Sequence, residues 1–196
     1  IKFKEDFSEK NKIKIRKKFK IAENSILFLF VGRLIEEKGI DLFIKSFKKA
    51  SERNNKIHLL IVGGGPLYND LKNLIHDFSN ISLSGPLYEK DLLETYSSAD
   101  IFVLPSISET WGLVINEAMA SSLPLLVNKN VGCIDDLVFD KENGIIFDFK
   151  NQKYLIESIL LLANSKDLRI KMALNSKKII SIWTLRNQAL KLSEGW

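Results

Sequence analysis

Apolar residues in this chain occur in two kinds of segment, which predict two kinds of secondary structure. Short, largely apolar runs predict strands that are covered on both faces. Longer stretches, in which apolar residues return at helical spacing, predict amphipathic helices. The predicted strands are Ile26–Val31, Ile57–Val62, Ile81–Leu83, Ile101–Leu104, Leu125–Val127 and Ile145–Phe149. The predicted helices are Ile40–Arg53, Leu67–Phe78, Glu89–Ser98, Leu113–Ala120, Gln152–Ala163 and Leu168–Ile180.

The regular alternation of strands and helices, joined by short loops, predicts the class of fold. It favours a doubly wound α/β fold, in which a six-stranded parallel sheet carries helices on both faces. In the common strand order 3-2-1-4-5-6, the first and fourth strands are neighbours, and a binding crevice opens between their carboxyl ends. We therefore expect the loop after the first strand, residues 32–39, to meet the loop that carries Glu109.

Length and composition limit the number of domains. With 196 residues, 45% of them apolar and 27% charged, the chain can bury one large core or two small ones. We divide it into a basic leader helix and linker over residues 1–24, a Rossmann-like domain over residues 25–182 and a tail helix segment over residues 183–196. Because the first residue is Ile rather than Met, we expect a piece of a longer protein.

The net charge of +5 is confined to the amino-terminal leader. Residues 1–20 hold nine Lys or Arg against three acidic residues, whereas the other 176 residues hold 20 basic and 21 acidic ones. Apolar residues separate the bases of the leader, which is compatible with peripheral contact to an anionic membrane or with a solvated helix and linker. The sequence has no helix-turn-helix, RNA-recognition signature or zinc-finger spacing, so we expect no nucleic-acid partner.

Cysteine usage and hydropathy indicate the compartment. The sequence has one cysteine, Cys133, which excludes an internal disulfide framework and a cysteine-rich metal site and fits a reducing compartment. No apolar run approaches the roughly 18 residues of a membrane span, and the start of the chain is too charged for a signal peptide. We expect a cytoplasmic protein, either free or at the inner face of the membrane.

Cations and backbone N–H groups at the expected crevice predict an anion site. Arg33 and Lys38 lie in the loop after the first strand. Together with the unsatisfied N–H groups that begin the next helix along the crevice, they would hold a phosphate or diphosphate without a metal. The alternative is that both are solvated cations paired with Glu36 and Glu37. The N–H groups are those of Gly112, Leu113 and Val114.

Two glutamates, eight residues apart, complete the expected crevice. Glu109 lies at its mouth, in the loop before the helix, and Glu117 lies about two turns inside the helix. Because a carboxylate can accept two hydroxyl protons, Glu117 suits a ribose diol, and Glu109 suits a sugar. The alternative is that Glu109 is a first-turn acid favoured by the helix dipole and Glu117 a solvated helix residue.

These motifs resemble those of a known enzyme family. The first reads Gly-Arg-Leu-x-x-x-Lys-Gly over residues 32–39. The second reads Ala-Asp-x-x-x-x-Pro-Ser-x-x-Glu-x-x-Gly-Leu-x-x-x-Glu-Ala-Met-Ala over residues 99–120. From about Ile26 to Trp183 the chain resembles the nucleotide-binding domain of the retaining family 4 glycosyltransferases, which have the two-Rossmann-domain GT-B fold. The paired glutamates are the most specific part of this resemblance.

The resemblance implies a role for each residue of the crevice. Arg33 and Lys38 would contact the donor diphosphate and stabilise it as it leaves. Glu109 would lie against the donor sugar, and Glu117 would hold the nucleotide ribose. The base would be read near Pro86 and Leu87. The full set of implied donor-binding residues is Gly32, Gly64, Pro86, Leu87, Trp111, Gly112, Leu113, Val114 and Glu117.

The chain departs from the family pattern in a few places. Trp111 stands where the family usually has Phe, which preserves a bulky apolar wall. Ser122 stands where many members have Gly, so a left-handed turn there is costly. Residues 132–133 and 135–136 replace common family residues in a loop beside the sugar, which leaves the choice of donor open. We interpret the adjacent aspartates 135–136 as a helix start rather than a metal site.

The implied activity is transfer of a sugar from a nucleotide-diphosphate donor with retention at the anomeric carbon, without a metal or other cofactor. The acceptor, a glycan or lipid-linked saccharide, would be bound by an amino-terminal domain that this chain lacks, so we expect the chain alone to be inactive. A nucleotide-sugar epimerase of GT-B architecture and a non-catalytic nucleotide-sugar-binding domain remain as alternatives. A nicotinamide-dependent oxidoreductase is excluded, because Gly32-Arg33-Leu34 replaces its Gly-x-Gly-x-x-Gly motif. His58 and His76, without an acid partner in view, are interpreted as a core and a surface residue.

Overall fold

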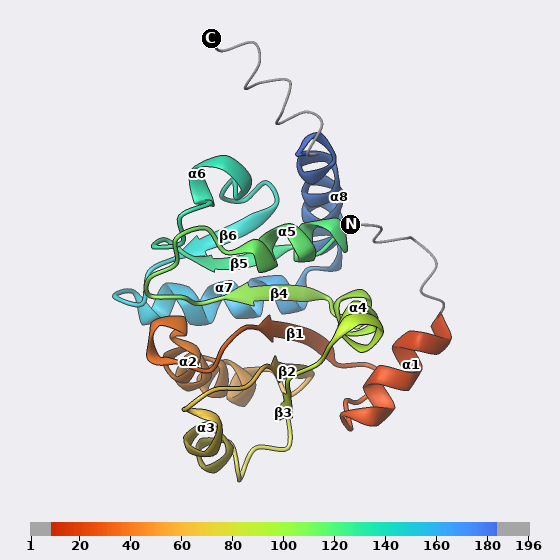
Figure 1. Cartoon of the computed structure of the whole chain (residues 1–196), viewed down its shortest axis with the longest axis vertical. Coiled ribbons are helices and arrows are strands. Elements are labelled where there is room, and N and C mark those ends of the chain that lie inside the picture. The colour runs from red at the N-terminus through yellow and green to blue at the C-terminus, as the bar shows by residue number, and fades with distance from the viewer. Residues whose placement is uncertain (1–8, 184–196) are drawn as a thin grey trace.

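The sheet has six parallel strands in the order β3-β2-β1-β4-β5-β6, which confirms the predicted doubly wound fold (Figure 1). The computed structural model describes the backbone of residues 9–183 and the side chains from residue 12 onward. The strands are β1 (Ile26–Val31), β2 (Ile57–Val62), β3 (Ile81–Gly85), β4 (Ile101–Leu104), β5 (Leu125–Asn128) and β6 (Gly144–Phe147). The helices are α1 (Glu9–Lys18), the 3-10 turn η1 (Glu36–Lys38), α2 (Ile40–Arg53), α3 (Tyr68–Leu74), α4 (Glu89–Ser98), α5 (Leu113–Ala120), α6 (Ile134–Leu137), α7 (Gln152–Asn164) and α8 (Lys166–Ile182).

The hydrophobic core lies between the sheet and the helices on its two faces. α2 and α7 cover one face, and α4 and α5 cover the other (Figure 1). Because both faces are covered, β2 and β4 are buried along their whole length. Aromatic rings join the layers, as where Phe28 of β1 meets Phe47 of α2 edge to face with 5.5 Å between ring centroids. Burial of each such ring contributes about 1.5–3 kcal/mol to the stability of the fold, so the sheet holds the ends of its loops in fixed positions.

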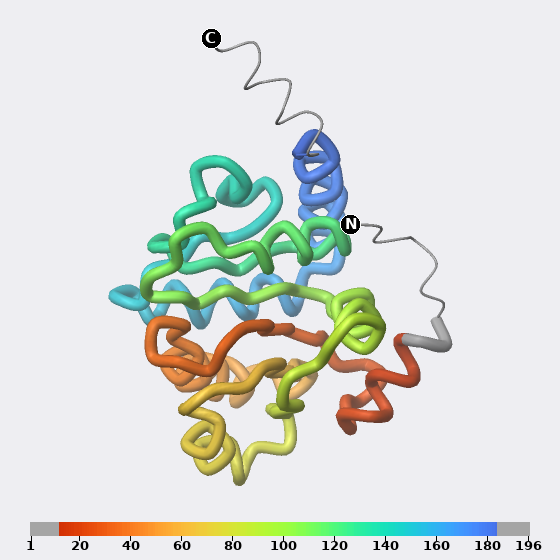
Figure 2. The backbone as a smooth tube through the Cα atoms, in the orientation of Figure 1, coloured from red at the N-terminus to blue at the C-terminus, as the bar shows by residue number. Residues whose placement is uncertain are grey.

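The carboxyl ends of the strands all point to the same edge of the sheet, because every strand pair is parallel. The loops after β1 and β4 come together at this edge (Figure 2). Their backbones are tied directly, since the N–H of Ile107 donates to the carbonyl of Glu37 at 2.8 Å. The topology therefore brings together the two sequence motifs that were expected to share a crevice.

Two predicted elements end earlier in the structure than in the sequence analysis. α3 ends at Leu74 rather than Phe78. After Leu74 the chain continues as turns, in which the apolar residues keep the helical spacing that suggested a longer helix. Phe78 still packs against the core, and the ammonium group of Lys48 lies 3.9 Å from its ring centroid. β6 ends at Phe147 rather than Phe149, whose ring packs edge to face against that of Phe147 at 5.2 Å. In both α3 and β6, the apolar spacing of the sequence thus continues beyond the last residue with regular hydrogen bonding.

Two predicted details near the site are confirmed. Ser122, just after α5, has a φ of 57°, in the left-handed region that glycine would adopt more easily. The aspartates at 135–136 lie in the first turn of α6, so they do start a helix. Both features belong to the connections that carry the chain from α5 to β5 and from β5 to β6.

The basic leader contains a helix, α1, which packs against α4 (Figure 1). Three of its cations form ion pairs with acids on α4 or just before β4, so much of its charge is already balanced. Residues 1–8 of the predicted leader and residues 184–196 of the predicted tail lie outside the described part of the chain. No helix within residues 9–183 is long and apolar enough to cross a bilayer. The pairs are Lys14–Glu94, Arg16–Asp100 and Lys18–Asp91, with N···O distances of 2.9, 2.9 and 2.8 Å.

Candidate functional site

A lysine and a glutamate from distant parts of the sequence meet at the carboxyl edge of the sheet. Lys38, at the end of η1, forms an ion pair with Glu109, in the loop after β4. The Lys38 side chain is 19% exposed and the Glu109 side chain 17%, so solvent screens the pair only partly. The alternative in which Lys38 pairs with Glu36 or Glu37 is therefore wrong.

The backbone of Glu109 is held by the loop after β5. The N–H of Gly132 donates to the carbonyl of Glu109 at 2.8 Å, and Glu109 forms an isolated β-bridge with Val131. A Cβ at residue 132 would lie 2.0 Å from the carbonyl oxygen of Thr110, which a glycine avoids. Gly132 thus allows the loop after β5 to approach the backbone of Glu109 closely, and this contact fixes the backbone position from which the Glu109 side chain extends.

The start of α5 presents backbone N–H groups beside Glu109. Gly112 is the residue before the helix, with a φ of 88°, and a Cβ there would lie 3.3 Å from the Cγ of Glu109. No acceptor within residues 9–183 receives a hydrogen bond from the backbone N–H of Gly112, Leu113 or Val114. These groups and the positive end of the helix dipole favour binding of an anion.

A pocket of about 360 Å³, which we call the edge pocket, opens at the carboxyl ends of β1, β2 and β3. It contains five of the predicted site residues. Among them, Arg33 is exposed and forms no ion pair or side-chain hydrogen bond with any residue in the described part of the chain. Its guanidinium is therefore available to an anion. The lining residues are Val31, Gly32, Arg33, Val62, Gly63, Gly64, Pro86, Leu87 and Tyr88.

The glycine triplet at residues 63–65 does more than end a strand. Gly63 has a φ of 147°, and a Cβ there would lie 1.8 Å from the carbonyl oxygen of Gly32. The N–H of Leu34 donates to the carbonyl of Gly64 at 3.0 Å. The triplet brings the backbones of the loops after β1 and β2 into direct contact and so shapes the edge pocket.

Glu117 lies in the second turn of α5 and is not a freely solvated residue. Its Oε2 accepts a hydrogen bond from the hydroxyl of Tyr96, on α4, at 2.7 Å. Tyr96 is fully buried, and this burial, together with the charge of Glu117, raises the pKa of Tyr96 above its usual range. The alternative of a solvated Glu117 is therefore wrong. No hydrogen bond or ion pair within residues 9–183 links Glu117 to the Lys38–Glu109 pair or to Arg33.

Comparison with known proteins assigns the chain to a family. The sequence model of the glycosyl transferases group 1 matches residues 11–179. The chain belongs to this family. An uncharacterized glycosyltransferase of Methanocaldococcus jannaschii is 30% identical over 176 residues, and the Staphylococcus aureus capsular polysaccharide biosynthesis glycosyltransferase CapM is 28% identical over 196 residues. These matches cover 88% and 93% of this chain but 45% and 51% of the relatives, so the chain spans about half their length.

Solved glycosyltransferase structures share the fold of this group 1 domain. The crystal structure of Anabaena HepE in complex with UDP-glucose matches with a TM-score of 0.81 and 22% sequence identity. The match covers 95% of this chain and 53% of that one. The six-stranded parallel sheet with helices on both faces is the Rossmann-like architecture of one half of a GT-B glycosyltransferase.

Trp111 forms an aromatic wall next to the start of α5 in this group 1 domain. Its indole N–H donates to the side-chain oxygen of Asn116 at 3.2 Å. Its ring lies against that of Trp183, with 5.6 Å between centroids. Because Trp183 directly follows α8, the ring pair joins the end of that helix to the loop that carries Glu109.

Three residues of the site were not predicted from the sequence. Tyr96 hydrogen bonds to Glu117, Gly132 supports Glu109, and Ser106 has a buried hydroxyl without a hydrogen-bond partner in the described part of the chain. The resemblance placed residue 132 in a loop beside the sugar, which was a signal for Gly132. The partners of Tyr96 and Ser106 carry no local sequence signal, because they depend on how α4, α5 and the loop after β4 pack.

The remaining ionisable candidates are accounted for by burial or by solvent exposure. His58 lies in the core as predicted, 2.9 Å from the hydroxyl of Ser82, and burial lowers the pKa of His58 to about 4. Burial also raises the pKa of the Cys133 thiol to about 12. His76 is on the surface as predicted, but it does have an acid partner, since its Nδ1 lies 2.8 Å from Asp77. Within residues 9–183, no three His, Cys, Asp or Glu side chains are grouped to hold a metal.

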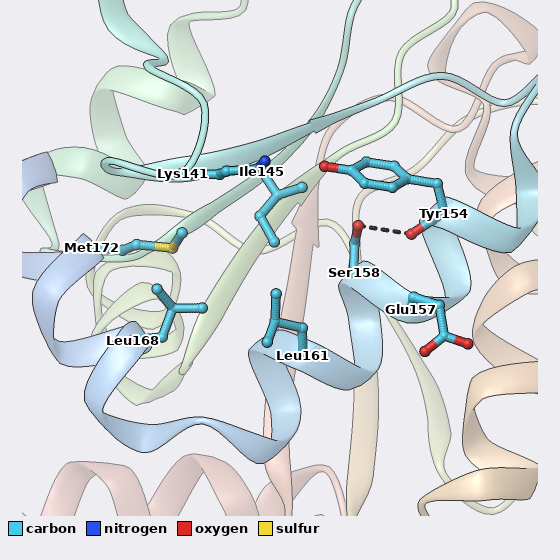
Figure 3. Close-up of a pocket in the computed structure, with 8 residues that line it drawn as sticks. All are labelled: Lys141, Ile145, Tyr154, Glu157, Ser158, Leu161, Leu168 and Met172. Carbon is cyan, nitrogen blue, oxygen red and sulfur yellow. Dashed lines mark hydrogen bonds between the residues drawn. The ribbon is translucent and has the colours of Figure 1, made fainter.

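A larger pocket of about 480 Å³ lies away from these residues, where α7 and α8 pass β6 (Figure 3). Its lining is largely apolar, including Leu161, Leu168 and Met172. Its polar Ser158 hydroxyl already donates to the backbone carbonyl of Tyr154 at 2.8 Å. None of the predicted site residues lines this pocket.

Proposed function

We propose that this chain is the donor-binding half of a retaining, metal-independent family 4 glycosyltransferase that uses a nucleoside diphosphate sugar. The observation that carries the proposal is the pairing of Lys38 with Glu109, in which a cation and a carboxylate from distant loops meet beside the topological switch point. Arg33 and the N–H groups that begin α5, which have no hydrogen-bond or ion-pair partner among residues 9–183, add anion-binding capacity at the same edge of the sheet.

In this proposal Arg33 and Lys38 bind the donor diphosphate and stabilise it as it leaves. When the bond between the anomeric carbon and the diphosphate oxygen lengthens, negative charge grows on the diphosphate. Cations that are already in place lower this barrier without reorganising. Glu109 lies against the donor sugar, and Glu117 accepts hydrogen bonds from the ribose hydroxyls. The base lies along the edge pocket, beside Pro86 and Leu87.

The acceptor is assigned to a second domain. Because the chain spans about half the length of its relatives, we propose that the other half binds a glycan or lipid-linked saccharide and helps to exclude water from the reaction. The capsular polysaccharide role of CapM supports a glycan acceptor, and the UDP-glucose bound to HepE supports a nucleotide-sugar donor. On this basis the chain alone binds the nucleotide but does not transfer the sugar.

Titration calorimetry of the 196-residue chain with uridine, guanosine and adenosine diphosphates tests the proposal. We expect one of them to bind, and Arg33→Ala to weaken that binding about 10- to 100-fold, since a hydrogen bond to a charged group contributes about 1.5–3 kcal/mol. Lys56→Ala is the matched control, because Lys56 is also exposed and precedes β2, at the opposite edge of the sheet. Absence of binding, or equal effects of the two substitutions, would refute the proposal.

A second measurement addresses the reaction. When the chain is part of its full-length protein, the product formed from the bound donor should retain the configuration of the anomeric carbon, as read by proton NMR of the product. An inverted product would refute the retaining assignment. Conversion of one nucleotide sugar to another without an acceptor would indicate the epimerase alternative. Donor binding without any turnover would indicate the non-catalytic alternative.

A further inference from the structure

We propose that Tyr96 is a positioning residue that fixes the Glu117 carboxylate in the orientation needed to bind the donor ribose, an inference that rests on the proposed function. The evidence is the hydrogen bond from the Tyr96 hydroxyl to Oε2 of Glu117, at 2.7 Å. The two residues lie on different helices, α4 and α5, so the contact is made by tertiary packing rather than by helical neighbours.

The Tyr96 hydroxyl is a rigid donor. Its side chain has no exposed surface, and its ring packs against that of Phe102 on β4, with 5.8 Å between centroids. A phenol has few rotatable bonds, so the packed ring holds the hydroxyl in place. Because burial and the charge of Glu117 raise the pKa of Tyr96 above its usual range, the hydroxyl keeps its proton near neutral pH and can donate to Glu117.

The hydrogen bond from Tyr96 gives the two oxygens of the Glu117 carboxylate different roles. Oε2 is engaged by Tyr96, whereas no hydrogen bond to Oε1 is found in the described part of the chain. The carboxylate is therefore anchored at one oxygen and leaves the other, with the remaining acceptor capacity of Oε2, for the two ribose hydroxyls. An unanchored glutamate would have to lose rotamer freedom when the ribose binds, which would weaken binding.

A purely structural role for Tyr96 makes a different prediction. If Glu117 only satisfies a buried hydroxyl, removal of that hydroxyl changes stability and leaves ribose recognition unchanged. The two roles are therefore separated by measuring how strongly the protein prefers a ribose to a ribose without its hydroxyls. This preference is a ratio of affinities, so a uniform loss of binding does not alter it.

The experiment compares a nucleoside diphosphate with its 2′,3′-dideoxy form by calorimetry on the 196-residue chain, using the uridine, guanosine and adenosine series. In the unsubstituted chain we expect the ribose form to bind about 10-fold more tightly, and Glu117→Ala to abolish this preference. Tyr96→Phe should reduce it to about threefold. Tyr154→Phe is the matched control, since Tyr154 lies on α7 beside the distant pocket and should keep the full preference (Figure 3).

The outcomes separate the failure of this inference from that of the proposed function. If no diphosphate binds, the proposed function fails. If a diphosphate binds and Glu117→Ala removes the preference while Tyr96→Phe retains it in full, the role of Tyr96 is refuted and the proposed function stands. If binding shows no ribose preference, the roles of both Glu117 and Tyr96 are refuted.

A second measurement keeps Tyr96 in place, so it tests the inference even if the Tyr96→Phe variant does not fold. The chain has four tyrosines, and all can be labelled as 3-fluorotyrosine and observed by fluorine NMR. The Tyr96 signal is assigned by replacing the others with Phe. It should shift with the ribose ligand and shift less with the dideoxy ligand. Equal shifts with both ligands would overturn the inference. The tyrosines to replace are Tyr68, Tyr88 and Tyr154.

Discussion

Replacement of Glu109 by Gln should strengthen binding of a nucleoside diphosphate to the chain, while it abolishes sugar transfer by the full-length protein. Without a ligand, Lys38 is paired with Glu109. A diphosphate that takes Lys38 as a partner must break this pair, so part of the binding free energy is lost. Glu109→Gln removes the competing negative charge but keeps a side chain of the same size. Transfer is lost because the carboxylate proposed to lie against the donor sugar is gone.

The expected magnitude follows from the partial burial of the pair. Fully exposed ion pairs contribute about 0–1 kcal/mol, and breaking a fully buried pair costs about 3–5 kcal/mol. With the two side chains 19% and 17% exposed, Lys38 and Glu109 lie between these limits. We take about 1 kcal/mol as the part that a diphosphate has to overcome, which corresponds to about fivefold tighter binding by the Gln variant.

Calorimetry with the nucleoside diphosphate that the chain binds measures this gain. Glu36→Gln is the matched control, because Glu36 lies on the same turn as Lys38 and its loss changes the net charge equally. Glu36 is exposed and is not the partner of Lys38, so its substitution should change affinity less than twofold. Weaker binding by Glu109→Gln, or an equal gain from Glu36→Gln, would refute the idea that Glu109 competes with the diphosphate for Lys38.

Two further predictions concern stability. Because the folded His58 has a pKa of about 4, lowered from 6.5, only the unfolded chain takes up a proton between these values, and stability falls as the pH drops. At pH 5 this loss is about 2 kcal/mol relative to pH 7, measured by urea unfolding; His58→Gln should remove this part, and His76→Gln should not. Gly63→Ala should destabilise the fold by about 3 kcal/mol or more, because the new Cβ would lie 1.8 Å from the carbonyl oxygen of Gly32. Gly64→Ala should cost less than about 1 kcal/mol in thermal unfolding, and equal losses for both would contradict the steric argument.

The strands could be located because most of them have a strong local signal. Ile26–Val31 is a continuous apolar run and Ile57–Val62 is apolar except for His58, and a parallel sheet buries such runs on both faces. The known handedness and order of doubly wound sheets then bring the first and fourth strands together. The ends of elements were predicted less well. Phe78 and Phe149 keep an apolar spacing that serves packing beyond the last regular hydrogen bond.

The sequence could predict which loops form the site but not which side chains pair within it. Arg33, Lys38 and Glu109 lie in connections that the fold brings to one edge, so their grouping follows from topology. The choice of Glu109 as the partner of Lys38, and of Tyr96 as the partner of Glu117, depends on side-chain orientations about rotatable bonds. The sequence alone could not decide between these partners and nearby exposed acids, because both arrangements have the same residue types at the same spacing.

In the loop after β1, Lys38 is already paired within the described part of the chain, whereas Arg33 is not. We infer from this difference the order in which the two cations engage the donor. Arg33 is exposed and unpaired within residues 9–183, so it can engage a phosphate without first leaving another group. Lys38 has to leave Glu109, and when it does so the Glu109 carboxylate becomes free to accept hydrogen bonds from a sugar. The diphosphate and the sugar therefore bind cooperatively in the proposed mechanism. A nucleoside diphosphate without a sugar should gain the whole advantage of Glu109→Gln, whereas the intact donor should gain less, because the same substitution also removes its sugar contact.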